Sequence, residues 1–134
     1  MASATQHGRH LVLLIDGTWV SASRKPRGEQ QSNIYWLNLF VQPQKAYGEA
    51  QFTFYIAGIG SVSRGDRWRG GVFAHGLERV VEEAYVNIVS YYAEGDKIYI
   101  FGFSRGAVVA RIVAYLISTF GVLKQRHIDV FRKM

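Results

Sequence analysis

Apolar residues in this chain gather in three short, unbroken runs and in two longer, periodic ones. The short runs cover residues 10–15, 52–57 and 98–103 and are rich in β-branched, leucine and aromatic side chains. Each run is bounded by polar residues or glycines, a pattern that predicts strands. The first run, His10-Leu-Val-Leu-Leu-Ile15, shows no alternation, which is typical of a strand buried on both faces of a parallel sheet.

The two longer runs repeat with the period of a helix. Apolar positions in residues 77–92 and 108–120 fall three or four residues apart and form one stripe on each predicted helix. A shorter helix is expected over residues 34–40, with Ser32 or Asn33 as its cap. Strands that alternate with helices predict the α/β class, in which helices flank a parallel sheet.

Polar and glycine-rich segments separate these elements and are expected to be loops. Residues 20–31 are mostly polar, and residues 61–76 combine glycines with arginines. Gly121 is suited to end the last helix, because glycine tolerates left-handed backbone. With 134 residues and no internal repeat, the chain is expected to form one domain over residues 1–134, with a basic tail from residue 124.

The junction between the third strand and the last helix carries a chemical motif. Gly102-Phe-Ser-Arg-Gly106 reads G-x-S-x-G between a strand and a helix, the context in which this motif forms a nucleophile elbow. Such a turn strains the serine backbone and needs neighbours almost free of side chains, which Gly102 and Gly106 provide. Ser104 would then stand at a helix N-terminus, whose N–H groups favour developing negative charge. The alternative is an ordinary turn in which Ser104 only caps the helix.

Composition excludes several classes of protein and of site. Apolar residues make up 49% of the chain and charged residues 19%, which excludes a disordered segment. There is no cysteine, so disulfides and thiolate metal sites are excluded, and no set of histidines and carboxylates has metal-ligand spacing. No cofactor is expected. Residues 1–10 lack the apolar core of a secretory signal, and residues 107–123 are short for a membrane span and include Arg111.

The net charge of +6 comes from small groups of basic residues. Such groups are able to meet phosphates of nucleic acid or lipid. No nucleic-acid motif accompanies them, so solvated loops are the preferred interpretation and no nucleic-acid partner is expected. Asp66, which lies among Arg64, Arg67 and Arg69, is interpreted as part of a surface ion-pair cluster rather than as a metal or phosphate site.

An ordered series of motifs runs along most of the chain. Its members are Ile15-Asp-Gly-Thr-Trp19, Asn33-Ile34, Tyr55-Ile-Ala-Gly-Ile-Gly60, Gly70-Gly-Val-Phe-Ala-His-Gly-Leu77, Glu83-Ala-Tyr85, Gly95-Asp-Lys-Ile-Tyr-Ile-Phe-Gly-Phe-Ser-Arg-Gly-Ala107 and Ala110-Arg111. This series resembles the N-terminal part of the Tle1-like domain of type VI secretion phospholipase effectors, over about residues 9–123. The resemblance implies a partial α/β-hydrolase-like parallel sheet with the strand order 2-1-3.

The resemblance also implies a serine esterase or phospholipase, with Ser104 as nucleophile and a lipid or another ester as substrate. In such an enzyme the N–H of Arg105 and an N–H of the loop at Gly17 and Thr18 would form the oxyanion hole. Asp16 would orient that loop through local hydrogen bonds. The protein would be made in the cytoplasm and, as an effector, be exported without a signal peptide.

The acid and the histidine of a catalytic triad have no match in this chain. An elbow serine is followed in sequence by an acid and then a histidine, whereas only His127 and Asp129 follow Ser104, in the opposite order. Either the chain is a fragment whose triad and sheet are completed by a C-terminal segment or a partner chain, or it is a non-catalytic remnant that serves as an interaction or assembly module. His75, in the glycine-rich loop, is a candidate for a substitute base, but a loop histidine that makes local hydrogen bonds is the preferred interpretation.

Two other motifs resemble those of phosphatases and of nucleotide-binding proteins, but each lacks a required residue. Asp16-Gly-Thr18 after a strand also resembles the D-x-D-G-T motif of haloacid-dehalogenase phosphatases, but Leu14 occupies the position of the nucleophilic aspartate. Gly58-Ile-Gly60 lacks the third glycine of G-x-G-x-x-G, because position 63 is a serine. It is therefore interpreted as a structural turn.

Overall fold

A small parallel sheet is the centre of the fold. The computed structural model describes residues 8–17, 31–41, 50–58 and 70–127. The strands are β1 (His10–Ile15), β2 (Gln51–Ile56) and β3 (Lys97–Gly102), and they lie parallel in the order β2-β1-β3. The α/β class and the strand order that the sequence predicts are both confirmed.

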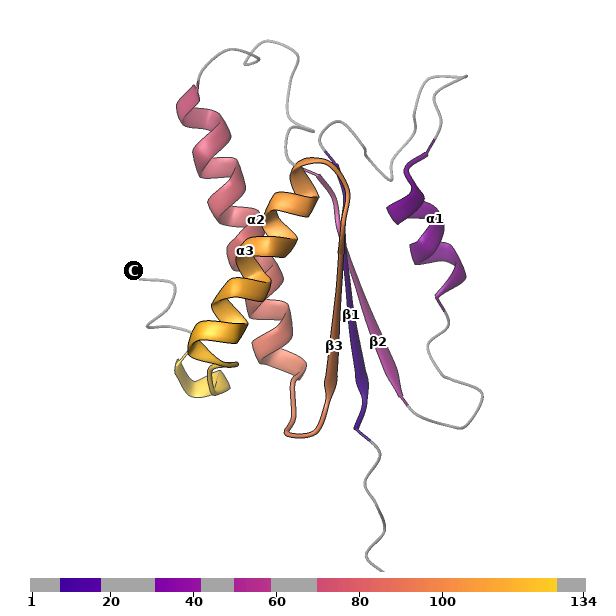
Figure 1. Cartoon of the computed structure of the whole chain (residues 1–134), viewed down its shortest axis with the longest axis vertical. Coiled ribbons are helices and arrows are strands. Elements are labelled where there is room, and N and C mark those ends of the chain that lie inside the picture. Colours follow the sequence, from indigo (N-terminus) through magenta and orange to yellow (C-terminus); the bar gives the residue numbers. More distant parts are fainter. Residues whose placement is uncertain (1–7, 18–30, 42–49, 59–69, 128–134) are drawn as a thin grey trace, which may run out of the picture.

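Helices cover both faces of this sheet. Their bounds are Asn33–Phe40 for α1, Gly70–Tyr91 for α2, Arg105–Phe120 for α3 and Gln125–His127 for the short 3₁₀ helix η1. α1 lies on one face, and α2 and α3 lie on the other (Figure 1). Within the described part of the chain, none of the helices is long and apolar enough to cross a membrane.

Local signals set the ends of the two shorter helices. The Ser32 hydroxyl caps α1, because it accepts a hydrogen bond from the Tyr35 N–H at 3.0 Å. α3 ends at Gly121, whose φ of 73° is a conformation that favours glycine. Both ends agree with the sequence prediction, which placed the cap of α1 at residue 32 or 33 and the end of α3 at residue 121.

The long helix α2 begins earlier than the sequence pattern indicates. The pattern predicts a loop through residue 76, whereas α2 begins at Gly70 and spans 22 residues. The prediction is wrong over residues 70–76, because three glycines in this stretch make it resemble a loop. Each glycine lowers helix propensity by about 1 kcal/mol relative to alanine, a local preference that tertiary context can override. The backbone of His75 therefore belongs to a helix and not to a loop.

β1 is buried along its whole length, as its unbroken apolar run predicts. Its side chains alternate between two cores, which lie on opposite faces of the sheet. Leu13 and Ile15 pack with residues of α2 and α3, whereas Val12 and Leu14 pack with Ile34 of α1. Full burial of an aliphatic side chain stabilises the fold by about 1.5–3 kcal/mol. β1 therefore joins the two cores into one structure.

The parallel register brings the carboxyl ends of the three strands level. Ile15 pairs with Ile56 of β2 and with Gly102 of β3. The pairing continues past the strands, because the Asp16 N–H donates to the Ile56 carbonyl oxygen at 2.9 Å and the Phe103 N–H donates to that of Ile15 at 3.1 Å. The turn after β1 therefore lies between the end of β2 and the turn from β3 to α3.

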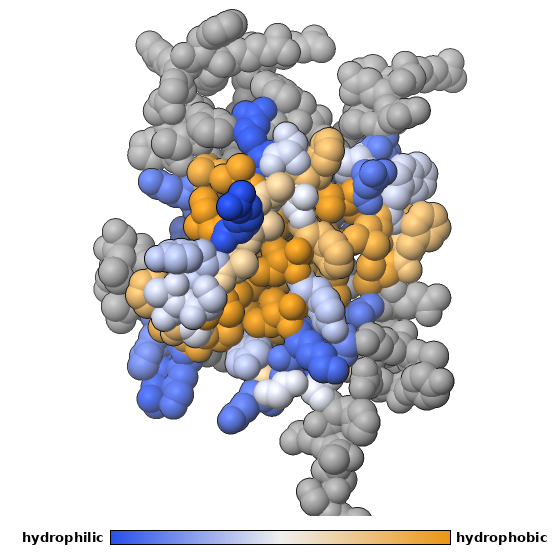
Figure 2. Space-filling model, in the orientation of Figure 1, coloured by the Kyte–Doolittle hydropathy of each residue, from blue (hydrophilic) through white to orange (hydrophobic). Residues whose placement is uncertain are grey.

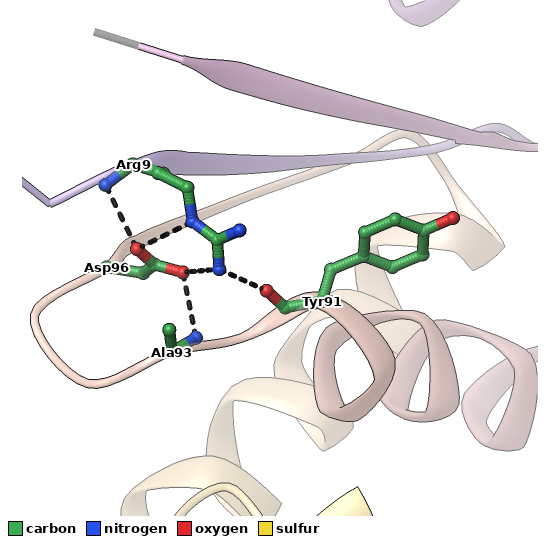
Figure 3. A network of polar contacts seen from close by, with 4 residues as sticks. All are labelled: Arg9, Tyr91, Ala93 and Asp96. Atoms are coloured by element: carbon green, nitrogen blue, oxygen red, sulfur yellow. Dashed lines mark hydrogen bonds and ion pairs between the residues drawn. The ribbon is translucent and has the colours of Figure 1, made fainter.

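At the opposite end of the sheet, Arg9 and Asp96 hold the start of β1 to the turn before β3 (Figure 3). The Asp96 carboxylate accepts hydrogen bonds from the N–H, Nε and Nη2 of Arg9 at 3.0, 3.2 and 2.8 Å and from the Ala93 N–H at 2.8 Å. Burial by itself raises the pKa of Asp96, but the hydrogen bonds from Arg9 and Ala93 outweigh it, so the pKa is lowered. This contact helps to set the register of β1 against β3.

β3 is a free edge of the described sheet. It pairs with β1 on one side, and its residues alternate between exposed and half-buried. Tyr99 and Phe101 are 39% and 43% exposed and, together with Leu37 and Val41, line a cavity of about 260 Å³ on the α1 side. On the side seen in Figure 2, hydrophobic residues gather over β3 and α3. An apolar edge of this kind is a template for pairing with further polypeptide.

We predict that Asp96→Asn destabilises the fold by about 1–3 kcal/mol at neutral pH, because it removes a charged acceptor from its hydrogen bonds at a site that is 3% exposed. Since the folded-state pKa of Asp96 is lowered, its contribution is complete above the unfolded pKa of about 4 and is lost as the pH falls through the folded value. Urea unfolding of both proteins at neutral and acidic pH measures this difference, which should shrink in acid. Glu94→Gln, at an exposed neighbour, is the control and should match the wild type. Equal stability of Asp96→Asn and wild type at neutral pH would contradict the prediction.

We also predict that the chain associates through the β3 edge at micromolar concentration. Light scattering should give a mass above that of one chain, and Phe101→Lys should lower it, because a lysine on an edge strand opposes pairing. Phe120→Lys is the matched control, since Phe120 is 67% exposed but lies at the end of α3. A stable wild-type monomer with cooperative thermal unfolding would show that this edge needs no partner.

Candidate active site

Ser104 has an unusual backbone conformation. It lies between β3 and α3 with φ 53° and ψ −121°, and no other non-glycine residue in the described ranges has a positive φ. Such a conformation costs on the order of 1–3 kcal/mol and persists only where its surroundings enforce it. Ser104 occupies the N-cap position of α3, but its exposed side chain makes no capping hydrogen bond. The geometry matches the strained turn of a nucleophile elbow and gives no support to a role as helix cap.

The two glycines of the motif are required by close backbone packing. A Cβ on Gly102 would lie 2.7 Å from the Ala107 Cα, and a Cβ on Gly106 would lie 2.6 Å from the Asp16 carbonyl oxygen. Both distances are shorter than real Cβ contacts, which essentially never fall below 3.0 Å. Larger residues at either position would therefore push α3 away from the sheet and open the turn that holds Ser104.

The loop after β1 lies beside Ser104. A Cβ placed on Gly17 would be 3.2 Å from the Ser104 Cβ and 2.8 Å from a ring carbon of Phe103. This proximity is what the strand order 2-1-3 predicts, because neighbouring parallel strands bring their carboxyl ends together. Thr18, the other residue expected in this loop, lies outside the described residues.

The buried carboxylate of Asp16 holds this loop by a hydrogen bond to its backbone. The side chain is 1% exposed and accepts hydrogen bonds from three of the described residues. The Gly17 N–H donates to Oδ1 at 2.7 Å, whereas the hydroxyls of Ser32 and Tyr55 donate to Oδ2 at 2.6 and 2.7 Å. The arrangement supports the orienting role predicted for Asp16. It also means that the Gly17 N–H is already engaged in this state of the protein.

The sequence predicts Ser32 only as a helix cap and predicts no role for Tyr55. The signal for Tyr55 was present in the strand order, since Tyr55 pairs with Leu14, two residues before Asp16. Alternation along both strands then puts Tyr55 on the same face as the Asp16 side chain. For Ser32 no such signal exists, because the chain between β1 and α1 does not specify where α1 begins in space.

The described histidines lie far from Ser104. His10 is at the opposite end of β1, a strand that spans about 16 Å at the usual rise per residue. His127 belongs to η1, beyond the far end of the 16-residue helix α3 (Figure 1). The side chain of His75 and all of Asp129 lie outside the described residues. No base for Ser104 is therefore assigned among the residues whose side chains are described.

Among the described residues, the phosphatase-like and glycine-rich motifs do not form a catalytic or ligand-binding site. Leu14, at the position of a phosphatase nucleophile, is completely buried. A Cβ on Gly58 would lie 2.9 Å from the Asp16 carbonyl oxygen, so Gly58 has a packing role at the end of β2. Asp66 lies outside the described residues, and among those described no group of three histidines and carboxylates could hold a metal ion.

Comparisons with known proteins agree with this geometry. The family model of "T6SS, Phospholipase effector Tle1-like, catalytic domain" matches residues 9–134. The chain is 30% identical over 138 residues to the uncharacterized protein YEL023C of Saccharomyces cerevisiae, an overlap that covers 92% of this chain and 19% of that protein. The chain thus spans about a fifth of the length of that relative. No solved structure matches. Because the family model covers almost the whole chain, the protein belongs to the family of Tle1-like phospholipase effector catalytic domains.

Proposed function

We propose that this chain is part of a serine hydrolase that cleaves lipid or phospholipid esters, with Ser104 as its nucleophile. The observation that carries the proposal is the strained Ser104 turn, which stands beside Gly17 at the carboxyl end of a parallel sheet. Family membership supports the substrate class, since the family is described by its phospholipase effectors. The same description supports a protein that is made in the cytoplasm and then exported.

In the proposed reaction the Ser104 Oγ attacks the ester carbonyl carbon while its proton passes to a base. The tetrahedral intermediate collapses, the bond to the alcohol oxygen breaks, and the alcohol leaves with that proton, so that the acyl group remains on Ser104. Water then attacks the acyl-enzyme in the same way and releases the acid. Each attack places negative charge on the carbonyl oxygen, so N–H donors directed at that oxygen accelerate both steps.

Arg105 and the loop after β1 supply the proposed donors. Arg105 is the first residue of α3, where the helix dipole favours an anion. The Gly17 N–H donates to Asp16, so we assign the second donor to the N–H of Thr18, the next residue in the loop. Gly17 then has a steric role, because a side chain at this position would meet Phe103 and Ser104.

We propose that the acid and the base come from polypeptide beyond these 134 residues, either a C-terminal segment or a partner chain. The handedness of the fold indicates where it would attach. α2 and α3 lie on the same face, and the connection through α2 runs from β2 across β1 to β3. A right-handed crossover through α3 would therefore place the next parallel strand on the free edge of β3. The carboxyl end of that strand would lie next to Ser104, within reach for an acid.

A non-catalytic interaction or assembly module is the second candidate function. Two observations favour it, namely the free edge of β3 and the distance of His10 and His127 from Ser104. A scaffold of this kind would keep the hydrolase fold without its chemistry, because fold alone does not specify activity. Under this alternative, Ser104 would be no more reactive than any other exposed serine.

We predict that a fluorophosphonate probe labels Ser104 slowly and selectively, since Ser104 is exposed in a strained turn and the proposed N–H donors would stabilise the adduct. Mass spectrometry of the labelled chain should locate the adduct on Ser104 and find none in Ser104→Ala. Ser118→Ala is the matched control, because Ser118 is another exposed serine, whose hydroxyl donates to the Tyr115 carbonyl oxygen. Labelling that is absent, or that is the same in Ser104→Ala, would favour the assembly module.

We further predict that this chain alone hydrolyses p-nitrophenyl esters weakly or not at all. Enzymes that lack a triad member keep only a residual rate, about 10³–10⁴-fold above that in water, from the oxyanion hole and binding. Turnover of wild type and Ser104→Ala, measured side by side, tests this. Fast turnover that Ser104→Ala abolishes would show that the chain holds its own base, and His75 would be the first residue to test.

A further inference from the structure

A hydrogen-bond network joins three elements beneath the candidate oxyanion loop. The Asp16 carboxylate follows β1, Ser32 precedes α1 and Tyr55 belongs to β2. Both hydroxyls donate to the same oxygen, Oδ2, at 2.6 and 2.7 Å, while Oδ1 accepts the Gly17 N–H. We infer that Tyr55 and Ser32 are positioning residues, which act through Asp16 to hold Gly17 beside Ser104; the inference rests on the proposed esterase function.

The direction of each hydrogen bond is determined by its chemistry. The Ser32 Oγ accepts the Tyr35 N–H at 3.0 Å, so its own proton is directed to Asp16. Burial, and next the hydrogen bond to Asp16, raise the pKa of the Tyr55 hydroxyl well above its usual range, so Tyr55 remains a donor. Asp16 therefore has donors from two other elements on one oxygen, which leaves the second oxygen directed at Gly17.

The orientation of the Asp16 side chain matters because the peptide group between Asp16 and Gly17 is closely packed on both sides. Gly58 at the end of β2 and Gly106 in α3 both approach the Asp16 carbonyl oxygen so closely that an added Cβ would lie within 3.0 Å of it. On the outer side Gly17 lies against Phe103 and Ser104. Packing thus limits lateral movement of the peptide group between Asp16 and Gly17. The Asp16 carboxylate sets the direction of the Gly17 N–H.

If one of the two hydroxyls is removed, the carboxylate is less firmly held and the loop opens more often. Exchange of the Gly17 amide hydrogen reports this opening directly, and the labelling rate of Ser104 reports its effect on chemistry. A hydroxyl that only stabilises the fold would change overall stability and leave the labelling rate of the folded chain unchanged. The two readouts therefore separate a positioning role from a structural one.

The experiment compares Tyr55→Phe and Ser32→Ala with the wild-type chain. Hydrogen exchange at Gly17, read by mass spectrometry with fragmentation, should become about tenfold faster in each variant, as expected for loss of one hydrogen bond to a charged group. The rate at which a fluorophosphonate labels Ser104 should fall by a similar factor. Ser32→Thr keeps the hydroxyl and should restore both rates. Tyr99→Phe and Ser118→Ala are matched controls, because Tyr99 stacks on His10 at the other end of the sheet and Ser118 lies on α3.

The outcomes distinguish this inference from the proposed function. Gly17 exchange and Ser104 labelling that stay at the wild-type rates in Tyr55→Phe and Ser32→Ala would overturn the positioning role, and so would faster exchange with unchanged labelling. A wild-type chain that is not labelled at all would refute the esterase proposal, and Gly17 exchange would still decide whether Tyr55 and Ser32 hold the loop. If Ser32→Ala fails to fold, Tyr55→Phe supplies the test, because it removes the other hydroxyl that donates to Asp16.

Discussion

The pairing of β1 with a parallel strand on each side is the constraint on which the rest of this structure depends. β1 is hydrogen-bonded along both edges and its side chains enter the cores on both faces of the sheet. A shift of its register by one residue would turn every core side chain to the wrong face. It would also move Gly17 away from Ser104, since the two meet only because Ile15 is level with Gly102. Stability and the candidate site thus rest on one strand.

The strain at Ser104 follows from the same pairing. The Phe103 N–H donates to the Ile15 carbonyl oxygen, which carries the sheet one residue past the end of β3. α3 begins only two residues later, and Gly106 packs against the backbone at the end of β1. The chain has to reverse direction between these two contacts, and Ser104 is the residue that does so. A positive φ at a non-glycine residue is thus maintained by hydrogen bonds and packing on either side of it.

The described structure contains some of the features of the proposed serine hydrolase site and lacks others. The elbow, the loop beside it and the carboxylate beneath that loop are all at the carboxyl end of the sheet. The described histidine side chains are not, and the edge where a further strand would attach is apolar and uncovered. The further strand proposed above would account for both features, because it would cover the apolar surface and bring new residues to Ser104. The family relative, of which this chain covers 19%, is long enough to contain such a strand.

The sequence by itself determined the α/β class, the three strands, a cap of α1 at residue 32 or 33, the end of α3 at Gly121 and the elbow motif. These features depend on local chemistry, namely apolar periodicity, capping hydroxyls and glycines next to a serine, which neighbouring residues are enough to reveal. The resemblance to Tle1-like domains added the strand order. Local chemistry misled at the start of α2, where three glycines resemble a loop but the backbone is helical. Only the tertiary structure decided that Ser32 and Tyr55 meet at Asp16, and that the Gly17 N–H is directed at a carboxylate. Those contacts join residues 16 and 39 positions apart, and their geometry depends on how the elements pack, which no local pattern specifies.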